Sequence, residues 1–206
     1  TDMPQIVFNI AEGLWGSARE SQIPAILDML KIPYTGSGPL TLGICLDKAR
    51  AKEILSYHNI PTARFFVAHS PLTTHHSPLS FPLIVKPLYE GSSKGIRNNS
   101  IVTDETLLKE RVDWIIAEYK QPAIIEEFLE GREFTVAMIG NGNSLKALPI
   151  VEINYSSLPA GVNPVYSYEA KWIWDTSDNP LEIFKCPAEI YEKLKKEIET
   201  ICKNAF

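Results

Sequence analysis

The sequence lacks three features that would place a protein in a specialised class. Its three cysteines, Cys45, Cys186 and Cys202, lie far apart and form neither a disulfide framework nor a metal-binding spacing. No apolar run approaches the about 20 residues of a membrane-spanning helix. No block of like charge occurs, and a net charge of −5 argues against nucleic acid as a partner. We therefore expect a cytoplasmic globular protein with neither a membrane nor a nucleic acid among its partners.

The composition is that of a globular protein: of the 206 residues, 45% are hydrophobic and 22% are charged. Residues 1–40 are typical of the end of an α/β domain. A buried strand is expected at 5–10, and Ser21 is the expected N-cap of the helix that follows. The apolar residues of that helix recur at the spacing of one face: Ile23, Ile26, Leu27 and Leu30.

Residues 41–121 are expected to continue the α/β part of the chain with further helices and strands. Asp47 is the expected N-cap of a helix. Its predicted inward residues are Ala51, Ile54, Leu55 and His58. Strands are expected at 64–68 and 82–86, and a helix at about 104–119. The predicted inward residues of this second helix are Leu108, Val112 and Ile115.

Residues 122–206 predict an α+β subdomain. The expected strands are 123–127, 133–139 and 145–153. Gly140–Asn143 is typical of the turn of a hairpin. Residues 155–180 lack periodicity and predict a long functional loop. Pro187 is expected to open a last helix, with these residues inward: Ile190, Leu194, Ile198 and Ile201.

The stretch 82–96, PLIVKPLYEGSSKGI, has the residues of an anion site without matching the Walker pattern. Gly91 and Gly95 let the backbone approach a phosphate closely, and Ser92 and Ser93 offer donors. Lys86, at a strand end, can reach a phosphate as a point charge. A plain hairpin turn with a lysine at its rim explains the same residues, so both interpretations stay open here.

The segment Glu126–Glu133 places acids at the end of one strand and at the start of the next. Such a hinge can offer backbone groups and carboxylates to a purine amino group and to ribose hydroxyls. A solvated acidic loop is the competing interpretation.

Several segments together resemble the ATP-grasp ligases, and among them the D-alanine–D-alanine ligase type. The matching blocks, in the family's order, are Phe8–Gly13, Ile32–Gly38, Leu46–Lys48, Asn59–Thr62, Pro82–Ile96, Glu126–Glu133 and Tyr168–Lys171. The resemblance implies an α/β and α+β chain with the ATP-grasp fold. It would comprise the end of a pre-ATP-grasp domain and two ATP-grasp subdomains, the last incomplete.

The resemblance also implies roles for individual residues. The implied ATP-binding residues are Lys48, Lys86, Ser93, Glu126, Glu127, Phe128, Leu129, Glu133 and Lys171. The implied substrate residues are Glu12, Ser92 and Tyr168, and the implied catalytic residues are Ser92 and Lys171. In this scheme the loop 92–95 closes over the phosphates that Lys48 and Lys86 contact. Glu126–Leu129 meet adenine, Glu133 holds the ribose, and Lys171 swings in to the γ-phosphate.

The implied reaction is ATP-dependent joining of a carboxylate and an amine through an acyl phosphate, as in cell-wall precursor synthesis. Its implied cofactors are ATP and Mg²⁺, with the metal ligands expected beyond Phe206. We therefore expect no metal ligands in the chain itself, which should be incomplete for catalysis. Small amino acids are the implied substrates, and a homodimer is a possibility that the family suggests.

Two positions depart from the family pattern and bear on the substrate. Glu12 stands where the family has a histidine, and a carboxylate there could meet an ammonium group. Trp172 stands where the D-alanine enzymes have a tyrosine. We therefore expect the hydrogen bond that this tyrosine makes between the loops 92–95 and 155–180 to be lost. A ligase for a different amino acid, or a nucleotide-binding module that does not ligate, therefore remains an alternative.

Two segments imitate metal sites. Glu152-Ile153-Asn154 has the letters of the family's metal block but precedes Lys171, so we interpret it as a strand. His75-His76 has no partner acids at metal spacing and is expected to be solvated.

Overall fold

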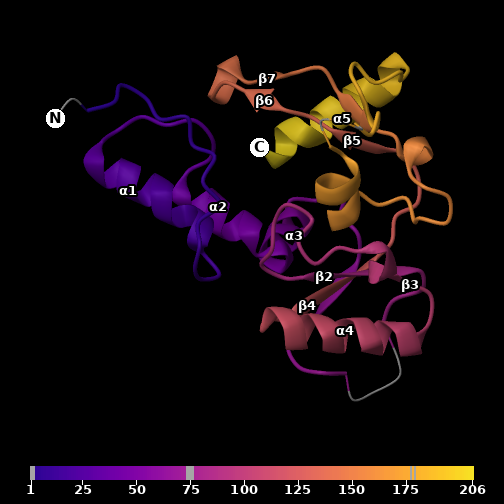
Figure 1. The fold of residues 1–206 in the computed structure, drawn as a ribbon. Coiled ribbons are helices and arrows are strands. Elements are labelled where there is room, and N and C mark those ends of the chain that lie inside the picture. The colour runs from indigo at the N-terminus through magenta and orange to yellow at the C-terminus, as the bar shows by residue number, and fades with distance from the viewer. Residues whose placement is uncertain (1–2, 73–76, 177, 179) are drawn as a thin grey trace.

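The computed structural model of the protein describes residues 3–72, 77–176, 178 and 180–206. A four-stranded antiparallel sheet has the strand order β1-β4-β2-β3. Its strands are β1 (Phe65–Ala68), β4 (Ala123–Glu127), β2 (Leu83–Pro87) and β3 (Ile101–Val102). Helix α4 (Glu105–Tyr119) covers one face of this sheet and α3 (Lys48–Tyr57) lies on the other side (Figure 1).

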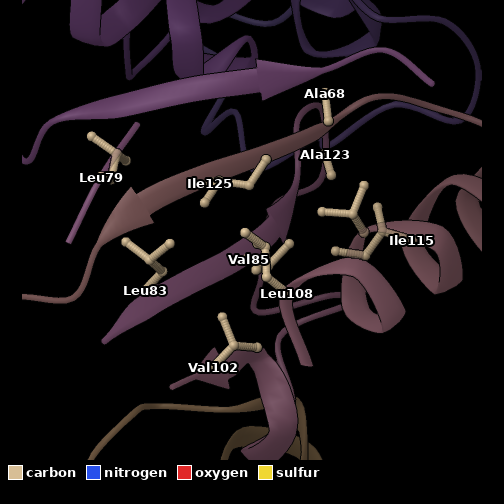
Figure 2. Close-up of a cluster of buried hydrophobic side chains, with 10 residues drawn as sticks. Ala68, Leu79, Leu83, Val85, Val102, Leu108, Ile115, Ala123 and Ile125 are labelled. Atoms are coloured by element: carbon tan, nitrogen blue, oxygen red, sulfur yellow. The ribbon is translucent and has the colours of Figure 1, made fainter. Parts of the chain in front are cut away.

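Alternation along β2 and β4 gives the sheet two unlike faces. Val85 and Ile125 point toward α4 and are fully buried there (Figure 2). The predicted inward residues of α4 complete this core, at 1%, 0% and 0% exposure: Leu108, Val112 and Ile115. Each such side chain contributes about 1.5–3 kcal/mol by leaving water. The neighbours of Val85 and Ile125 along each strand therefore face α3.

Helix α3 begins as predicted, because the Asp47 carboxylate accepts hydrogen bonds from the backbone N–H groups of Ala49 and Arg50 at 3.0 and 3.1 Å. Its predicted inward face is confirmed only in part, because Ala51 and Leu55 are half-buried whereas His58 is exposed. Ala49 and Lys52 are the buried residues, and Ile54 is 43% exposed. The apolar pattern misled because the face toward the sheet is occupied by a charged side chain with a buried partner on β4.

The N-terminal part differs from expectation in three ways. Residues 5–10 form only one isolated parallel bridge, Val7 with Tyr34, and Phe8 is 78% exposed, so the buried strand is wrong. Ser21 does not cap α1 (Gln22–Leu30), because its Oγ donates to the carbonyl of Pro39 instead. Ile23, Ile26 and Leu30 are exposed, and only Leu27 of the expected apolar face is buried. Helix α2 (Pro39–Leu46) was not predicted, although proline at its first position is a start signal.

In the C-terminal part each long predicted strand is divided in two. The pieces are β5 (Glu133–Thr135), β6 (Met138–Ile139), β7 (Lys146–Ala147) and β8 (Val151–Ile153). Strand β5 pairs with β8, and β9 (Phe184–Lys185) extends that sheet. The predicted hairpin is present, because β6 and β7 pair with Ile139 opposite Lys146.

Helix α5 (Glu192–Ala205) begins after Tyr191 rather than at Pro187, so the predicted start is wrong. Leu194, Ile198 and Ile201 are partly buried on one side of it. The remaining helical turns are short: η1 (Arg19–Ser21), η2 (Asn98–Ser100), η3 (Gly142–Ser144), η4 (Tyr155–Ser157) and the π-type turn η5 (Ala170–Trp174). Within the described residues no helix is both long and apolar enough to cross a bilayer.

Candidate functional site

A buried cluster of charge lies on the α3 side of the sheet. Lys86 of β2 and Glu126 of β4 project from this face, and the Lys86 Nζ lies 2.6 Å from the Glu126 Oε1. Lys52 reaches this face from α3, and its Nζ lies 3.0 Å from the other carboxylate oxygen of Glu126. The Lys52 ammonium also donates to the hydroxyl of Thr62 at 2.7 Å. Two lysines therefore hold one carboxylate in a fixed position.

The electrostatics of this cluster leave an excess of positive charge. Burial alone would raise the pKa of Glu126, but the charge and hydrogen bond of Lys86, together with those of Lys52, hold it below its ordinary value. Glu126 is therefore ionised at neutral pH. One carboxylate between two ammonium groups leaves about one unit of positive charge, which favours an anion on this face.

Lys48, at the start of α3, adds a third cation. Its Nζ donates to the carbonyl oxygens of Pro87 and Leu88 at 3.0 and 3.2 Å, and also to that of Glu90. Burial and the nearby Lys86 charge lower the pKa of Lys48 to about 8. Lys48 thus ties α3 to the chain that leaves β2, and its charge is sensitive to any anion that arrives.

The loop Gly91–Gly95, which we call the lid loop, has an unusual backbone. Ser92, Ser93 and Gly95 have φ values of 50°, 59° and 77°, in the left-handed region. The N–H of Lys94 bonds to the carbonyl of Gly91 at 2.9 Å and closes the turn. This tight turn lies next to the end of β2, and its role as a cover for phosphates stays a prediction.

The start of the lid loop is anchored through Glu90. Its carboxylate accepts from Arg19 at 3.3 Å and from the Gln121 side chain at 2.8 Å, and Lys94 lies 3.4 Å away. Arg19 also donates to the carbonyl of Tyr89 at 2.9 Å. The N-terminal segment and the end of α4 are therefore joined at one side chain.

The lid loop meets the long loop 155–180, as the sequence predicted. Ser93 Oγ donates to the carbonyl of Tyr166 at 2.7 Å, and the N–H of Tyr168 donates to the carbonyl of Ile96 at 2.8 Å. The indole N–H of Trp172 donates to the carbonyl of Ser92 at 3.1 Å. The hydroxyl of the family tyrosine is absent, as expected, and the indole supplies a different hydrogen bond between the two loops.

Two predicted substrate residues are in direct contact. Ser92 Oγ donates to Glu12 Oε1 at 2.7 Å. Both residues line a cavity of about 910 Å³, together with Trp15, Tyr168 and Trp172. A second acid, Glu20, lies nearby, and burial followed by the Glu12 charge raises its pKa against the opposing effect of Arg19. This cavity thus carries carboxylates together with the cations Arg19, Lys94 and Lys120.

The other predicted nucleotide residues follow β4 along the chain. Glu127 pairs with Arg64 at 3.2 Å, and the N–H of Phe128 donates to the carbonyl of Pro82 at 3.0 Å. Leu129 is 70% exposed. The Glu133 carboxylate accepts a hydrogen bond from the Tyr155 hydroxyl, and burial together with this bond raises the pKa of Tyr155. No contact among the described residues joins Glu133 to the lysine cluster.

Lys171 lies in η5 without an ion pair among the described residues. Its Nζ lies 5.9 Å from the ring centroid of Tyr166 and 5.7 Å from that of Trp172. The side chain therefore rests over aromatic rings on the loop that contacts the lid loop. Its predicted contact with a γ-phosphate stays a prediction.

Sequence reasoning missed Lys52 and Arg19. Lys52 follows Lys48 by four residues, so both lie on one side of α3, and this spacing could have indicated a shared site. Arg19 carries no motif, and its link to Glu90 spans 71 positions of the chain. Only the fold reveals that contact.

Glu152-Ile153-Asn154, which has the letters of a metal block, does not form a metal site in the described part of the chain. Glu152 is held by Arg132, whose Nε lies 2.7 Å from its Oε1, and Asn154 caps the turn that follows β8. His75 and His76 lie outside the described residues. No group of three His, Cys, Asp or Glu side chains within the described ranges is placed to hold a metal ion. The described residues therefore form no metal cage made of protein ligands alone.

Comparison with known proteins identifies the fold. The VanG D-Ala:D-Ser ligase of Enterococcus faecalis superposes with a TM-score of 0.73 at 24% identity, over 98% of this chain and 55% of that one. A D-alanine–D-alanine ligase of Bacillus anthracis complexed with ATP gives a TM-score of 0.67 at 24% identity, over 98% and 60%. The fold is therefore that of an ATP-grasp protein.

The family follows from sequence. Residues 54–206 match the family described as "D-ala D-ala ligase C-terminus", and the chain belongs to that family. The D-alanine–D-alanine ligase of Bordetella avium is 32% identical over 97% of this chain, and the uncharacterized protein y4sG of Sinorhizobium fredii is 35% identical over 98%. The chain spans 58% and 56% of the length of these relatives. The resemblance inferred from the blocks is confirmed.

Proposed function

We propose that this chain binds ATP and serves a ligase that joins a carboxylate to an amine through an acyl phosphate. The observation that carries the proposal is the buried Lys52–Glu126–Lys86 cluster beside a lid loop that already contacts the loop bearing Lys171. In the proposal this cluster is the phosphate site and the lid loop is its cover. The relatives named D-alanine–D-alanine ligase support the same activity.

In this proposal the chain's own residues bind and orient the nucleotide. Lys86, fixed by Glu126, and Lys48 would hold the phosphates, and Ser93 would meet them with its backbone N–H, because its hydroxyl is donated to Tyr166. The strand end at Glu126 and Glu127 would meet the adenine, with backbone at Leu129 and packing from Phe128. Glu133 would accept from the ribose hydroxyls, and Lys171 would reach the γ-phosphate.

Closure explains why the two loops matter for such chemistry. An acyl phosphate hydrolyses readily, so water must be kept from it until an amine attacks. The bonds of Ser93 to Tyr166 and of Trp172 to Ser92 hold the loops together over the site. Bound ATP would supply the phosphoryl group for this activation.

The acceptor is proposed to be a small amino acid, with D-alanine as the first candidate and cell-wall precursor synthesis as the setting. A specific observation favours a different amino acid as a second candidate. Glu12 stands at a family histidine position and accepts from Ser92 in the cavity beside the lid loop. The carboxylate of Glu12 would favour a substrate that presents an ammonium group at this position over one that presents a carboxylate.

The test is phosphate release by the intact protein supplied with ATP, Mg²⁺ and D-alanine. Release with D-alanine supports the named activity, whereas release only with another amino acid or dipeptide supports the second candidate. ATP binding without release for any carboxylate–amine pair would leave a nucleotide-binding module and overturn the ligase. Lys86→Gln is the matched control, because it should abolish release for every substrate.

A further inference from the structure

The arginines of this protein separate into two groups by their partners. Each member of one group forms an ion pair with a glutamate: Arg19, Arg50, Arg64 and Arg132. Arg97 and Arg111 form no ion pair with any acid of the described residues, and both line one cavity of about 250 Å³. This cavity lies between η2, β3 and α4, on the opposite side of the sheet from Lys86.

The two guanidinium groups share one aromatic ring. The guanidinium carbon of Arg111 lies 4.1 Å from the ring centroid of Trp114, and that of Arg97 lies 5.1 Å from it. Each contact is favourable by itself, but two like charges beside one ring repel each other. Burial and the Arg97 charge lower the pKa of Arg111 to about 10, which leaves the side chain cationic at neutral pH. The cavity therefore has positive charge with no bonded counter-charge.

Arg111 also has a donor to spare. The residue is 4% exposed, and its Nη2 donates to the carbonyl of Gly95 at 2.6 Å and to Ser100 Oγ at 2.9 Å. Its Nε is buried and has no hydrogen-bond partner. An unpaired buried N–H is costly, and a charged one more so, so the protein alone does not fully satisfy this guanidinium group.

We propose that this cavity is a binding site for a small oxyanion, a phosphate or a carboxylate, held between Arg97 and Arg111 against Trp114. The planar guanidinium groups match the geometry of such oxygens, and the exposed Arg97 can move to meet a ligand that Arg111 has fixed. Glu110 also lines the cavity and opposes the anion with its charge. Glu169 does not line the cavity but acts on Arg111 with its charge, so two arginines attract the anion against the charges of two glutamates.

The site has a route to the proposed ATP site through the lid loop. Arg111 donates to Gly95, the last residue of that loop, and a ligand on the same guanidinium would hold that donor in place. Occupancy is therefore expected to slow amide hydrogen exchange in Gly91–Gly95. This makes the cavity a place where a small anion regulates closure, independent of which substrate the chain serves.

The experiment titrates the intact protein with inorganic phosphate and, separately, with succinate, both at constant ionic strength. Binding is read from the emission of Trp114 in a variant whose other tryptophans are phenylalanine, and from the thermal midpoint of the unsubstituted protein. Arg97→Gln should weaken binding at least tenfold, because it removes a charge-assisted contact. Glu110→Gln should strengthen binding.

Two control variants separate this site from other effects. Arg50→Gln removes a charge from an exposed ion pair on α3 and should leave the titration unchanged. Lys86→Gln disables the proposed ATP site and should also leave the Trp114 response unchanged, so the two proposals can fail separately. Saturation by phosphate alone or by succinate alone supports the site and identifies the oxyanion. No saturable response to either, or equal affinity in Arg97→Gln, would overturn it.

Discussion

Replacing Gly95 by alanine is expected to destabilise the protein far more than the same change at Gly91 in the same loop. Gly95 has a φ of 77°, and an added Cβ would lie 2.9 Å from Pro87 Cδ and 3.1 Å from Tyr119 Cζ, with Pro87 Cγ closer still. Neither ring can yield as a flexible chain end would, because Pro87 is fully buried in β2. The lid loop would have to shift away from the strand.

The magnitude follows from two costs. A side chain in the left-handed region costs about 1–2 kcal/mol, and overpacking against buried neighbours costs about 1–3 kcal/mol. The sum is about 2–5 kcal/mol, which lowers Tm by about 4–20 °C in a domain of this size. At Gly91 the added Cβ meets only Glu20 Oε1, at 3.6 Å, so that change should stay within about 0.5 kcal/mol.

Urea denaturation of both variants, followed by circular dichroism, measures the difference directly. A lower midpoint with an unchanged slope for Gly95→Ala shows a loss of stability rather than a change in the unfolded state. Equal midpoints for the two variants would refute the reasoning, because the backbone strain and the contact with Pro87 would then have no energetic weight.

Four further outcomes are expected. Lys86→Met should lower ATP affinity at least tenfold by calorimetry, because it removes a cation from the cluster. Glu126→Gln should reduce the fall in the free energy of unfolding at acid pH. Folding lowers the pKa of Glu126, so this carboxyl stabilises the protein above its ordinary pKa. That stabilisation is lost as the pH falls through the pKa of the folded state. ATP binding at pH 8 should take up about half a proton, because phosphates raise the pKa of Lys48 from about 8; calorimetry in two buffers measures this. Trp172→Phe should speed hydrogen exchange in the lid loop, because the bond to Ser92 is lost.

Each of these outcomes has a clear contrary result. Wild-type ATP affinity in Lys86→Met would place the phosphates elsewhere. A Glu126→Gln curve parallel to wild type between pH 6 and pH 3 would mean that this carboxyl is not depressed. Binding enthalpies that do not depend on the buffer would remove Lys48 from the ATP site, and unchanged exchange in Trp172→Phe would make its indole bond irrelevant to closure.

The sequence predicted best what depends on neighbours in the chain. The N-cap at Asp47, the apolar face of α4 and the turn between β6 and β7 are set by local chemistry, and all are confirmed. The family was identified from short blocks in a fixed order, and the match over 54–206 confirms it. The roles of individual site residues remain predictions.

What failed depends on partners that are distant in sequence. The segment 5–10 is apolar enough for a strand, but pairing makes a strand, and only Val7 finds a partner. The inward face of α3 was misjudged because a lysine, Lys52, is buried there by Glu126, 74 positions away. The inter-loop bond of Trp172 was missed because its acceptor is a backbone carbonyl, which no side-chain pattern reveals.

The two unlike faces of β2 limit which insertions and deletions the protein can accept in evolution. Val85 faces the apolar core and Lys86, the next residue, faces the charged cluster. A deletion or insertion of one residue within the strand would exchange them, placing an ammonium group in the core and a valine at the site. Stability and chemistry would be lost in one event. Insertions and deletions are therefore expected to be tolerated outside β2 and β4 but not within them.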